Sequence, residues 1–230
     1  MQSFDIVKET EAAQSFRVAS VIGRFDLQSA KVVERFKGSF DLPESWNVGM
    51  IVGNSGTGKT SIAKHLFPDE YIEGFTYSAA SVLDDMPAGA TVEQIIKAFN
   101  AVGFSSPPSW LKPYAVLSNG EKMRCDLARA IVSKFPLFVF DEFTSVVDRN
   151  VAQIGSFAIQ KAVRKVNTKF IAVTCHYDVE NWLLPDWVFD TNSMTFIIAD
   201  GKKKDPTLKL NSLKPAKRHI SGVCSESIII

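Results

Sequence analysis

The sequence predicts an α/β fold in which helices flank a mostly parallel sheet. Short runs of consecutive apolar residues recur along the chain, as is typical of strands that are buried on both faces of such a sheet. Segments with helical spacing alternate with these runs, and this alternation indicates right-handed βαβ units. The predicted parallel strands are residues 50–52, 137–140, 170–173 and 187–189.

The N-terminal part of the chain predicts a different arrangement. Residues 16–21 and 31–42 have the composition of strands, and we expect no helix between them. Consecutive strands without a crossover helix pair in the antiparallel sense. An antiparallel β layer is therefore expected ahead of the parallel core.

Three later segments carry the signals of helices. Residues 91–94 have the pattern Thr-x-x-Gln and residues 118–121 have the pattern Ser-x-x-Glu, and each pattern is a capping box that begins a helix. Apolar residues follow each box at helical spacing. Residues 150–166 predict a third helix.

The composition excludes several classes of protein. With 230 residues, of which 46% are hydrophobic, the chain can bury a core without disulfides or a structural metal. Its three cysteines, Cys125, Cys175 and Cys224, have no CxxC spacing and are expected to be reduced thiols. No apolar run approaches the roughly 18 residues that span a bilayer, and the first residues do not form a signal peptide. We therefore expect a cytoplasmic protein without membrane insertion.

The formal net charge of +1 divides unevenly along the chain. Residues 201–230 hold seven basic and two acidic residues, a net charge of +5, so that the other residues together carry −4. We expect one folded domain over residues 1–200 and a basic C-terminal extension over residues 201–230. The extension is expected to be a solvated segment, and the alternative is a segment that binds nucleic acid or a protein partner.

A complete phosphate-binding motif, G-x-x-x-x-G-K-[ST], follows the first predicted parallel strand. Its glycines let the backbone wrap around a phosphate, and the helix that it opens points its positive dipole end at the anion. A chance glycine-rich turn is the alternative, and the flanking strand and helix argue against it. We expect Lys59 to reach the β- and γ-phosphates of ATP and Thr60 to coordinate Mg²⁺. The expected nucleotide-binding residues are Gly53, Asn54, Ser55, Gly56, Thr57, Gly58, Lys59, Thr60 and Ser61.

Two carboxylates follow the predicted strand at residues 137–140. The strand delivers Asp141 to the carboxyl edge of the sheet, where open α/β folds bind their ligands. There Asp141 can hold a water of the Mg²⁺ shell, and Glu142 can polarise an attacking water. Adjacent carboxylates can also be solvated loop residues, but the complete phosphate loop favours a metal site.

The segment Leu117-Ser118-Asn119-Gly120-Glu121 resembles the LSGGQ signature of the ATP-binding cassette (ABC) family, with Asn for the first middle glycine and Glu for Gln. Residues 145–148 resemble the D-loop of that family, and residues 173–176 resemble the strand that delivers its switch histidine. These motifs occur in the order that the family uses. The resemblance covers about residues 16–198 and implies a P-loop NTPase fold.

The resemblance also implies a head-to-tail homodimer that sandwiches ATP between the phosphate loop of one chain and the signature of the other. It assigns Ser118 and Gly120 to a γ-phosphate bound in trans, although Ser118 could also be a cap alone. Catalysis would then involve Lys59, Glu142 as the residue that orients water, and His176 as the γ-phosphate sensor. Asp148, in the D-loop, would cross the dimer interface.

An aromatic side chain usually stacks on adenine in this family, and Phe25 is the candidate, with Phe16 in reserve. Arg124, one turn into the signature helix, is predicted to be a solvated surface charge. No Q-loop glutamine is found, and Asp84 and Asp85 stand roughly where that loop is expected.

The interval between Lys59 and Ser118 is 59 residues, which is short for a transporter cassette and predicts a shortened helical region. Together these features predict a Mg²⁺-dependent ABC-type ATPase in a non-transport role, acting on nucleic acid or switching a protein partner. The alternative is the nucleotide-binding subunit of an ABC transporter with separate membrane chains. A third possibility is a switch that binds ATP and hardly hydrolyses it.

Overall fold

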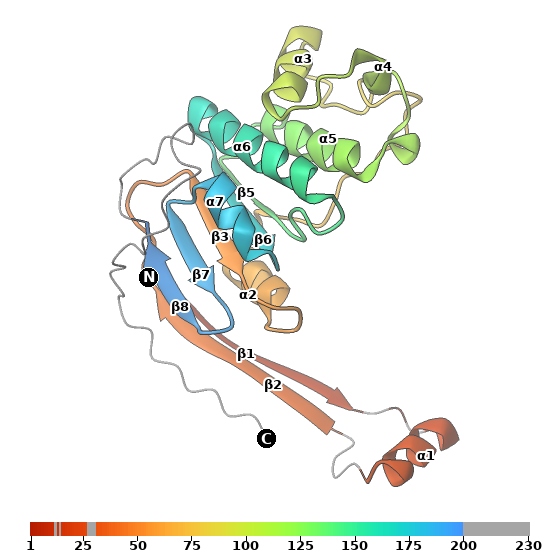
Figure 1. The fold of residues 1–230 in the computed structure, drawn as a ribbon, viewed down its shortest axis with the longest axis vertical. Coiled ribbons are helices and arrows are strands. Elements are labelled where there is room, and N and C mark those ends of the chain that lie inside the picture. The colour runs from red at the N-terminus through yellow and green to blue at the C-terminus, as the bar shows by residue number, and fades with distance from the viewer. Residues whose placement is uncertain (12, 14, 27–30, 200–230) are drawn as a thin grey trace.

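A mostly parallel sheet forms the centre of the computed structural model, which describes residues 1–11, 13, 15–26 and 31–199 (Figure 1). Within these residues the strand order is β4-β5-β6-β3-β7-β8, and β8 runs antiparallel to β7. The α/β prediction is therefore confirmed, and the expected basic extension lies outside the described residues. The strands are β3 (Val48–Val52), β4 (Tyr71–Ile72), β5 (Leu137–Phe140), β6 (Lys169–Thr174), β7 (Trp187–Asp190) and β8 (Thr195–Ile198).

Each face of the sheet has its own apolar core. Along β3, Met50 and Val52 belong to one core and Ile51 to the other, and all five residues of the strand are buried. This double burial explains why the strand is continuously apolar instead of alternating. The helices are α2 (Lys59–Leu66), α3 (Val92–Ala101), α4 (Pro107–Trp110), α5 (Asn119–Val132), α6 (Arg149–Val166) and α7 (Glu180–Leu183), with the 3₁₀ helices η1 (Tyr114–Val116) and η2 (Tyr177–Val179).

Both predicted capping boxes are present. Thr91 Oγ1 accepts a hydrogen bond from the Gln94 amide at 3.3 Å, and Gln94 Oε1 accepts one from the Thr91 amide at 3.0 Å. Ser118 and Glu121 make the same reciprocal pair at 3.4 Å and 2.9 Å. Each box satisfies amides that a helix leaves without a partner at its first turn.

The N-terminal segment forms an arm. Strands β1 (Gln2–Glu11) and β2 (Lys31–Phe40) pair antiparallel along their whole length, and α1 (Phe16–Arg24) lies beyond the far end of this hairpin (Figure 1). The antiparallel layer was predicted, but the strand predicted at residues 16–21 is a helix, and β1 was missed. Ser15 caps that helix by accepting from the Val18 amide at 3.3 Å, and Val18, Val21, Ile22 and Phe25 follow helical spacing.

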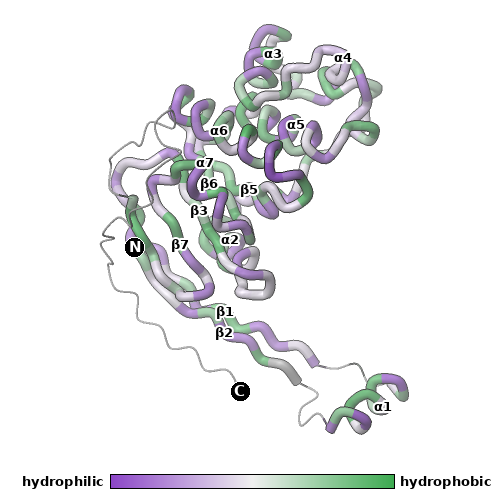
Figure 2. The backbone as a smooth tube through the Cα atoms, in the orientation of Figure 1, coloured by the Kyte–Doolittle hydropathy of each residue, from purple (hydrophilic) through white to green (hydrophobic). Residues whose placement is uncertain are grey.

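The base of the arm is held by aromatic packing. Phe40 lies 4.5 Å from Phe196 between ring centroids in a stacked arrangement, and 5.0 Å from Phe189. Next to these buried rings, Arg35 pairs with Asp5 at 2.6 Å across the two strands. The outer part is more polar, as Figure 2 shows. The arm is thus anchored at one end and solvated at the other.

We expect Gly49→Ala to destabilise the fold, because a Cβ at this position in β3 would lie 2.1 Å from the Trp187 ring. Overpacking of this kind costs about 1–3 kcal/mol, and urea unfolding followed by tryptophan fluorescence would measure it. Gly89→Ala is the control, since a Cβ there meets nothing within 4 Å. Equal midpoints for the two variants would contradict the packing that we describe.

Candidate functional site

Parallel pairing brings three loops to one edge of the sheet. Val52 of β3 pairs with Thr174 of β6, and Phe140 of β5 pairs with Ala172 of β6, so the carboxyl ends of these strands are close to level. The phosphate motif follows β3, Asp141 follows β5 and His176 comes two residues after β6. The topology therefore gathers at one edge the motifs that lie far apart in the sequence, as open α/β folds do.

The phosphate motif forms a loop that ends in an uncapped helix. Gly56 and Gly58 have φ values of +85° and +83°, a conformation that favours glycine. Gly58 is the N-cap of α2, and no described side chain caps that helix. The first amides of α2 therefore remain available to an anion. Lys59 is 8% exposed, and its Nζ donates to the Asn54 carbonyl at 2.7 Å.

The turn between β7 and β8 supports this loop from behind. Thr191 and Thr57 share a hydrogen bond at 2.6 Å between their hydroxyls, and Asn192 Oδ1 accepts from the Asn54 amide at 3.1 Å. A Cβ on Gly53 would lie 2.1 Å from Thr191 Oγ1, so the loop and the turn fit only with glycine there. Sequence reasoning missed Thr191 and Asn192, although they follow a predicted strand.

Asp141 accepts hydrogen bonds from three different parts of the candidate site. Its Oδ2 accepts from the Thr60 hydroxyl at 2.8 Å and from the Tyr71 hydroxyl at 2.5 Å, and its Oδ1 accepts from the Glu142 amide at 2.8 Å. Burial and the adjacent Asp141 carboxylate raise the pKa of Tyr71, so its hydroxyl stays protonated. Mg²⁺ is usually held by one or two protein oxygens together with phosphate oxygens. The Thr60 hydroxyl and the Asp141 carboxylate fit that requirement.

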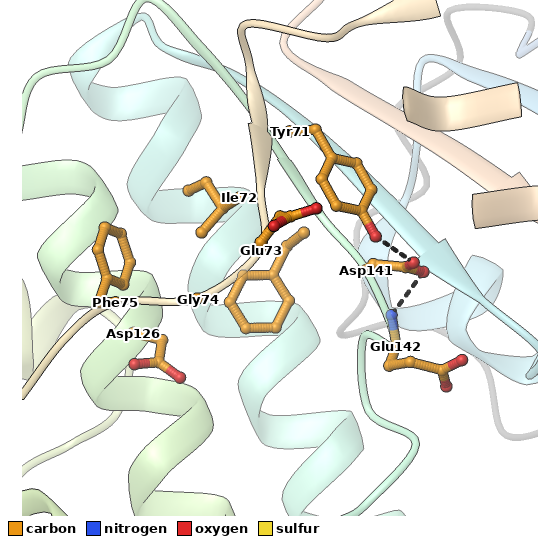
Figure 3. Close-up of a pocket in the computed structure, with 9 residues that line it drawn as sticks. Tyr71, Ile72, Glu73, Gly74, Phe75, Asp126, Asp141 and Glu142 are labelled. Atoms are coloured by element: carbon orange, nitrogen blue, oxygen red, sulfur yellow. Dashed lines mark hydrogen bonds between the residues drawn. The ribbon is translucent and has the colours of Figure 1, made fainter. Parts of the chain in front are cut away.

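A cavity of about 290 Å³ opens beside Asp141 (Figure 3). It is lined by Tyr71, Glu73, Asp141 and Glu142 at one end and by Phe75 and Asp126 at the other. Glu142 is exposed and has a φ of +50°, and Figure 3 shows its carboxylate directed away from Asp141. His176 is half-buried, and its amide donates to the Thr174 hydroxyl at 3.1 Å.

The signature residues lie elsewhere in the chain. Ser118 is exposed at the start of α5, which lies apart from α2 in Figure 1. A Cβ on Gly120 would lie 2.9 Å from Val151 of α6, so packing between α5 and α6 already requires this glycine. The D-loop residue Asp148 caps α6 by accepting from the Asn150 and Val151 amides at 3.0 Å.

Two further expectations need correction. Arg124 is half-buried rather than solvated, and it donates to the Gly103 carbonyl at 3.3 Å. Asp84 and Asp85 are engaged within their own loop, where Asp85 accepts from the Ser78 and Ala79 amides. Glu73, which directly follows β4, also lines the cavity beside Asp141.

The aromatic candidates for adenine are not near the phosphate loop. Phe16 begins α1 and Phe25 is its C-cap, both exposed, and α1 lies beyond the arm and away from α2 in Figure 1. Residues 16–21, which were predicted as a strand beginning at Phe16, are instead part of α1, and Phe25 ends that helix. Phe36 of β2 is the aromatic residue in contact with this loop, since a Cβ on Gly58 would lie 2.7 Å from its ring.

A second polar cluster ties the segment after β4 to the signature helix. Asp126 of α5 accepts from the Tyr77 hydroxyl at 2.8 Å and from the Tyr114 hydroxyl at 2.7 Å. The rings of these two tyrosines stack at 3.9 Å between centroids, and Arg129 lies 4.7 Å from the Tyr77 ring centroid. Burial raises the pKa of Asp126, and the two hydroxyls and Arg129 only partly offset this effect.

No protein-family model and no curated protein matches the sequence. Among solved structures, the dimeric ATP-binding cassette MJ0796 in a post-hydrolysis state with ADP and Pi has a TM-score of 0.59 at 12% identity, over 82% of this chain and 93% of that chain. Another dimeric structure of MJ0796, a bacterial ABC transporter cassette, has a TM-score of 0.55 at 12% identity, over 80% and 94%. An inward-facing metal-chelate type ABC transporter has a TM-score of 0.54 at 16% identity, over 86% and 84%.

The chain therefore has the P-loop NTPase fold of an ATP-binding cassette. The resemblance that the sequence motifs predicted is confirmed at the level of the fold. Among the described residues, no helix combines the length and apolar character that crossing a membrane requires.

The raised pKa of Asp126 predicts a pH-dependent stability. Because its pKa in the folded state exceeds the unfolded value of about 3.9, the folded protein holds an extra proton between the two values, and its stability falls as pH rises through that window. Relative to Asp126→Asn, wild-type protein should therefore lose stability with rising pH, at no more than about 1.4 kcal/mol per pH unit. Urea unfolding at a series of pH values would measure the difference.

In the same urea experiment, the contribution of Glu121 to stability is expected to change with pH in the opposite direction. A hydrogen bond from Ser109 and one from the Ser118 amide lower the pKa of Glu121, so wild type should gain stability over Glu121→Gln as pH rises.

For the first prediction, a stability difference between wild type and Asp126→Asn that stays constant with pH would contradict the burial of the Asp126 charge.

Proposed function

We propose that the protein is a Mg²⁺-dependent ATPase of the ABC type that dimerises around ATP. The observation that carries this proposal is the uncapped N-terminus of α2, which opens beside the hydrogen-bonded pair Thr60 and Asp141. The start of α2 offers amides and Lys59 for phosphate, and Thr60 of α2 together with Asp141 after β5 offers oxygens for a metal. This combination is the division of labour by which P-loop enzymes bind nucleoside triphosphates.

In this proposal the phosphate loop holds ATP through residues 53–61, and Lys59 leaves the Asn54 carbonyl to contact the β- and γ-phosphates. Thr60 and Asp141 would hold Mg²⁺, which when bound neutralises phosphate charge. Glu142 would orient the attacking water and accept its proton, and His176 would contact the γ-phosphate. Glu142 must then turn from its exposed orientation toward the phosphate, a change that dimerisation could drive.

The dimer is the second part of the proposal. Ser118 is exposed at the positive end of α5, and this helix lies apart from α2 of its own chain in Figure 1. A second chain, arranged head to tail, can bring its own α5 to that loop, so that ATP joins the two surfaces. The structures of MJ0796 to which this chain is similar are described as dimeric, and one holds ADP and Pi.

The proposed cellular role depends on the partner on which the ATPase acts. We favour a cytoplasmic, non-transport role, in which residues 1–200 form the ATPase domain and the basic residues 201–230 contact nucleic acid or a protein partner. The alternative is a nucleotide-binding subunit of an ABC transporter, which the transporter neighbours favour. Stimulation of hydrolysis by DNA or RNA would support the first role, and co-purification with a membrane protein would support the second.

Substitution of Glu142 tests the enzyme. We expect Glu142→Gln to slow ATP hydrolysis by about 10²-fold or more, since general-base catalysis supplies a factor of that size. The variant should accumulate as a dimer with ATP and Mg²⁺ in size-exclusion chromatography with light scattering. Lys59→Ala in the same background is the control, and it should stay monomeric. Unchanged turnover in Glu142→Gln would rule out the role of this residue, and a binding switch without hydrolysis would then be favoured.

Two isosteric variants separate the capping role of Ser118 from its proposed role in trans. Asp and Asn are both good N-cap residues, so Ser118→Asp and Ser118→Asn should both keep α5. A carboxylate beside the γ-phosphate is repelled, however, and the ATP-dependent dimer of Ser118→Asp should be at least about tenfold weaker than that of Ser118→Asn. Dissociation constants from sedimentation would measure this ratio. Equal constants would mean that Ser118 only caps the helix.

A further inference from the structure

Tyr71 makes a contact with the metal-binding carboxylate that no sequence motif indicated. It belongs to β4, the edge strand, whose Tyr71 and Ile72 pair with Val139 and Phe140 of β5. The register places Tyr71 next to β5, the strand that Asp141 directly follows. Its hydroxyl donates to Asp141 Oδ2 at 2.5 Å (Figure 3).

The Tyr71 side chain is itself held in place from the helix that follows the phosphate loop. The ammonium group of Lys64 in α2 lies 4.9 Å from the centre of the Tyr71 ring, and it also pairs with Glu73 Oε1 at 2.5 Å. A cation over an aromatic face is attracted by the ring quadrupole. Lys64 therefore couples both residues flanking Ile72 to α2, whose first turn carries Thr60.

The hydrogen bond from Thr60 to Asp141 determines how the Thr60 hydroxyl can coordinate a metal. A threonine hydroxyl has one hydrogen to donate and two lone pairs to offer. Thr60 donates its hydrogen to Asp141 Oδ2, which leaves its lone pairs for a cation. This arrangement requires the Asp141 carboxylate to face Thr60. Tyr71 donates to Asp141 Oδ2, the same oxygen that accepts from Thr60.

We propose that Tyr71 is a positioning residue that holds Asp141 toward Thr60 and so prepares both oxygens for Mg²⁺ bound with ATP. The inference rests on the proposed function, because it assigns Tyr71 to the metal half of that site. Tyr71 itself contacts neither nucleotide nor metal. Its loss should weaken the metal dependence of ATP binding and leave metal-free binding of ATP intact.

The test uses Tyr71→Phe in the Glu142→Gln background, so that binding is measured without turnover. A fluorescent ATP analogue is titrated first in EDTA and then at increasing Mg²⁺ concentration. A hydrogen bond to a charged group is worth enough that its loss should raise the Mg²⁺ concentration for half-maximal binding about tenfold. The affinity in EDTA should match that of the parent protein.

Tyr114→Phe is the matched control, because it also removes a tyrosine hydroxyl that donates to an aspartate, here Asp126, which is not a proposed metal ligand. It should leave the Mg²⁺ dependence unchanged, and thermal unfolding of both variants would report any general loss of stability. An unchanged Mg²⁺ dependence in Tyr71→Phe would overturn the inference, as would an equal loss of affinity in EDTA. Failure of the parent protein to bind the analogue under any condition would overturn the proposed function and this inference with it.

Discussion

The strand β3 is the constraint on which the rest of the structure depends. It is buried on both faces and hydrogen-bonded to β6 on one edge and to β7 on the other. Its side chains therefore pack alternately into the two cores. Position 49 requires glycine, because a Cβ there would clash with the Trp187 ring. Because β3 is held so tightly, the loop that follows it starts from a defined position. From that position the loop turns through Gly56 and Gly58, whose positive φ values glycine adopts readily.

Asp141 directly follows β5, which is separated from β3 by β6, and it is a second point on which the site depends. It joins α2 through Thr60, the edge strand β4 through Tyr71 and its own loop through the Glu142 amide. Three elements that are distant in the sequence thus converge on one carboxylate, and each brings a donor. The hydrogen bond from Tyr71 is partly buried, whereas those from Thr60 and from the Glu142 amide are exposed. A second carboxylate, Asp126, plays a similar part between the segment after β4 and α5.

Features whose signals lie within a few residues of one another could be predicted from the sequence, and features that depend on distant contacts could not. The buried parallel strands and the two capping boxes could be predicted because their signals lie within a few residues. The segment at residues 16–21 could not, because alternation of apolar and polar residues there competes with a helical spacing that extends to Phe25. Contacts such as those of Tyr71 with Asp141 and Asn192 with Asn54 depend on strand register, and register is decided by tertiary packing. The role of Gly120 in packing against Val151 was hidden for the same reason.

The base of the arm is in direct contact with the phosphate loop. Phe36 of β2 rests against Gly58, the residue from which α2 starts, and the two-stranded ribbon continues from there to Lys31. A strand advances about 3.4 Å per residue, so the far end of the ribbon lies about 17 Å from this pivot. If the ribbon moves as a stiff lever, a rotation of about 10° at Phe36 displaces its far end by about 3 Å. The displacement caused by any such rotation would therefore be larger at the far end of the ribbon than beside Gly58.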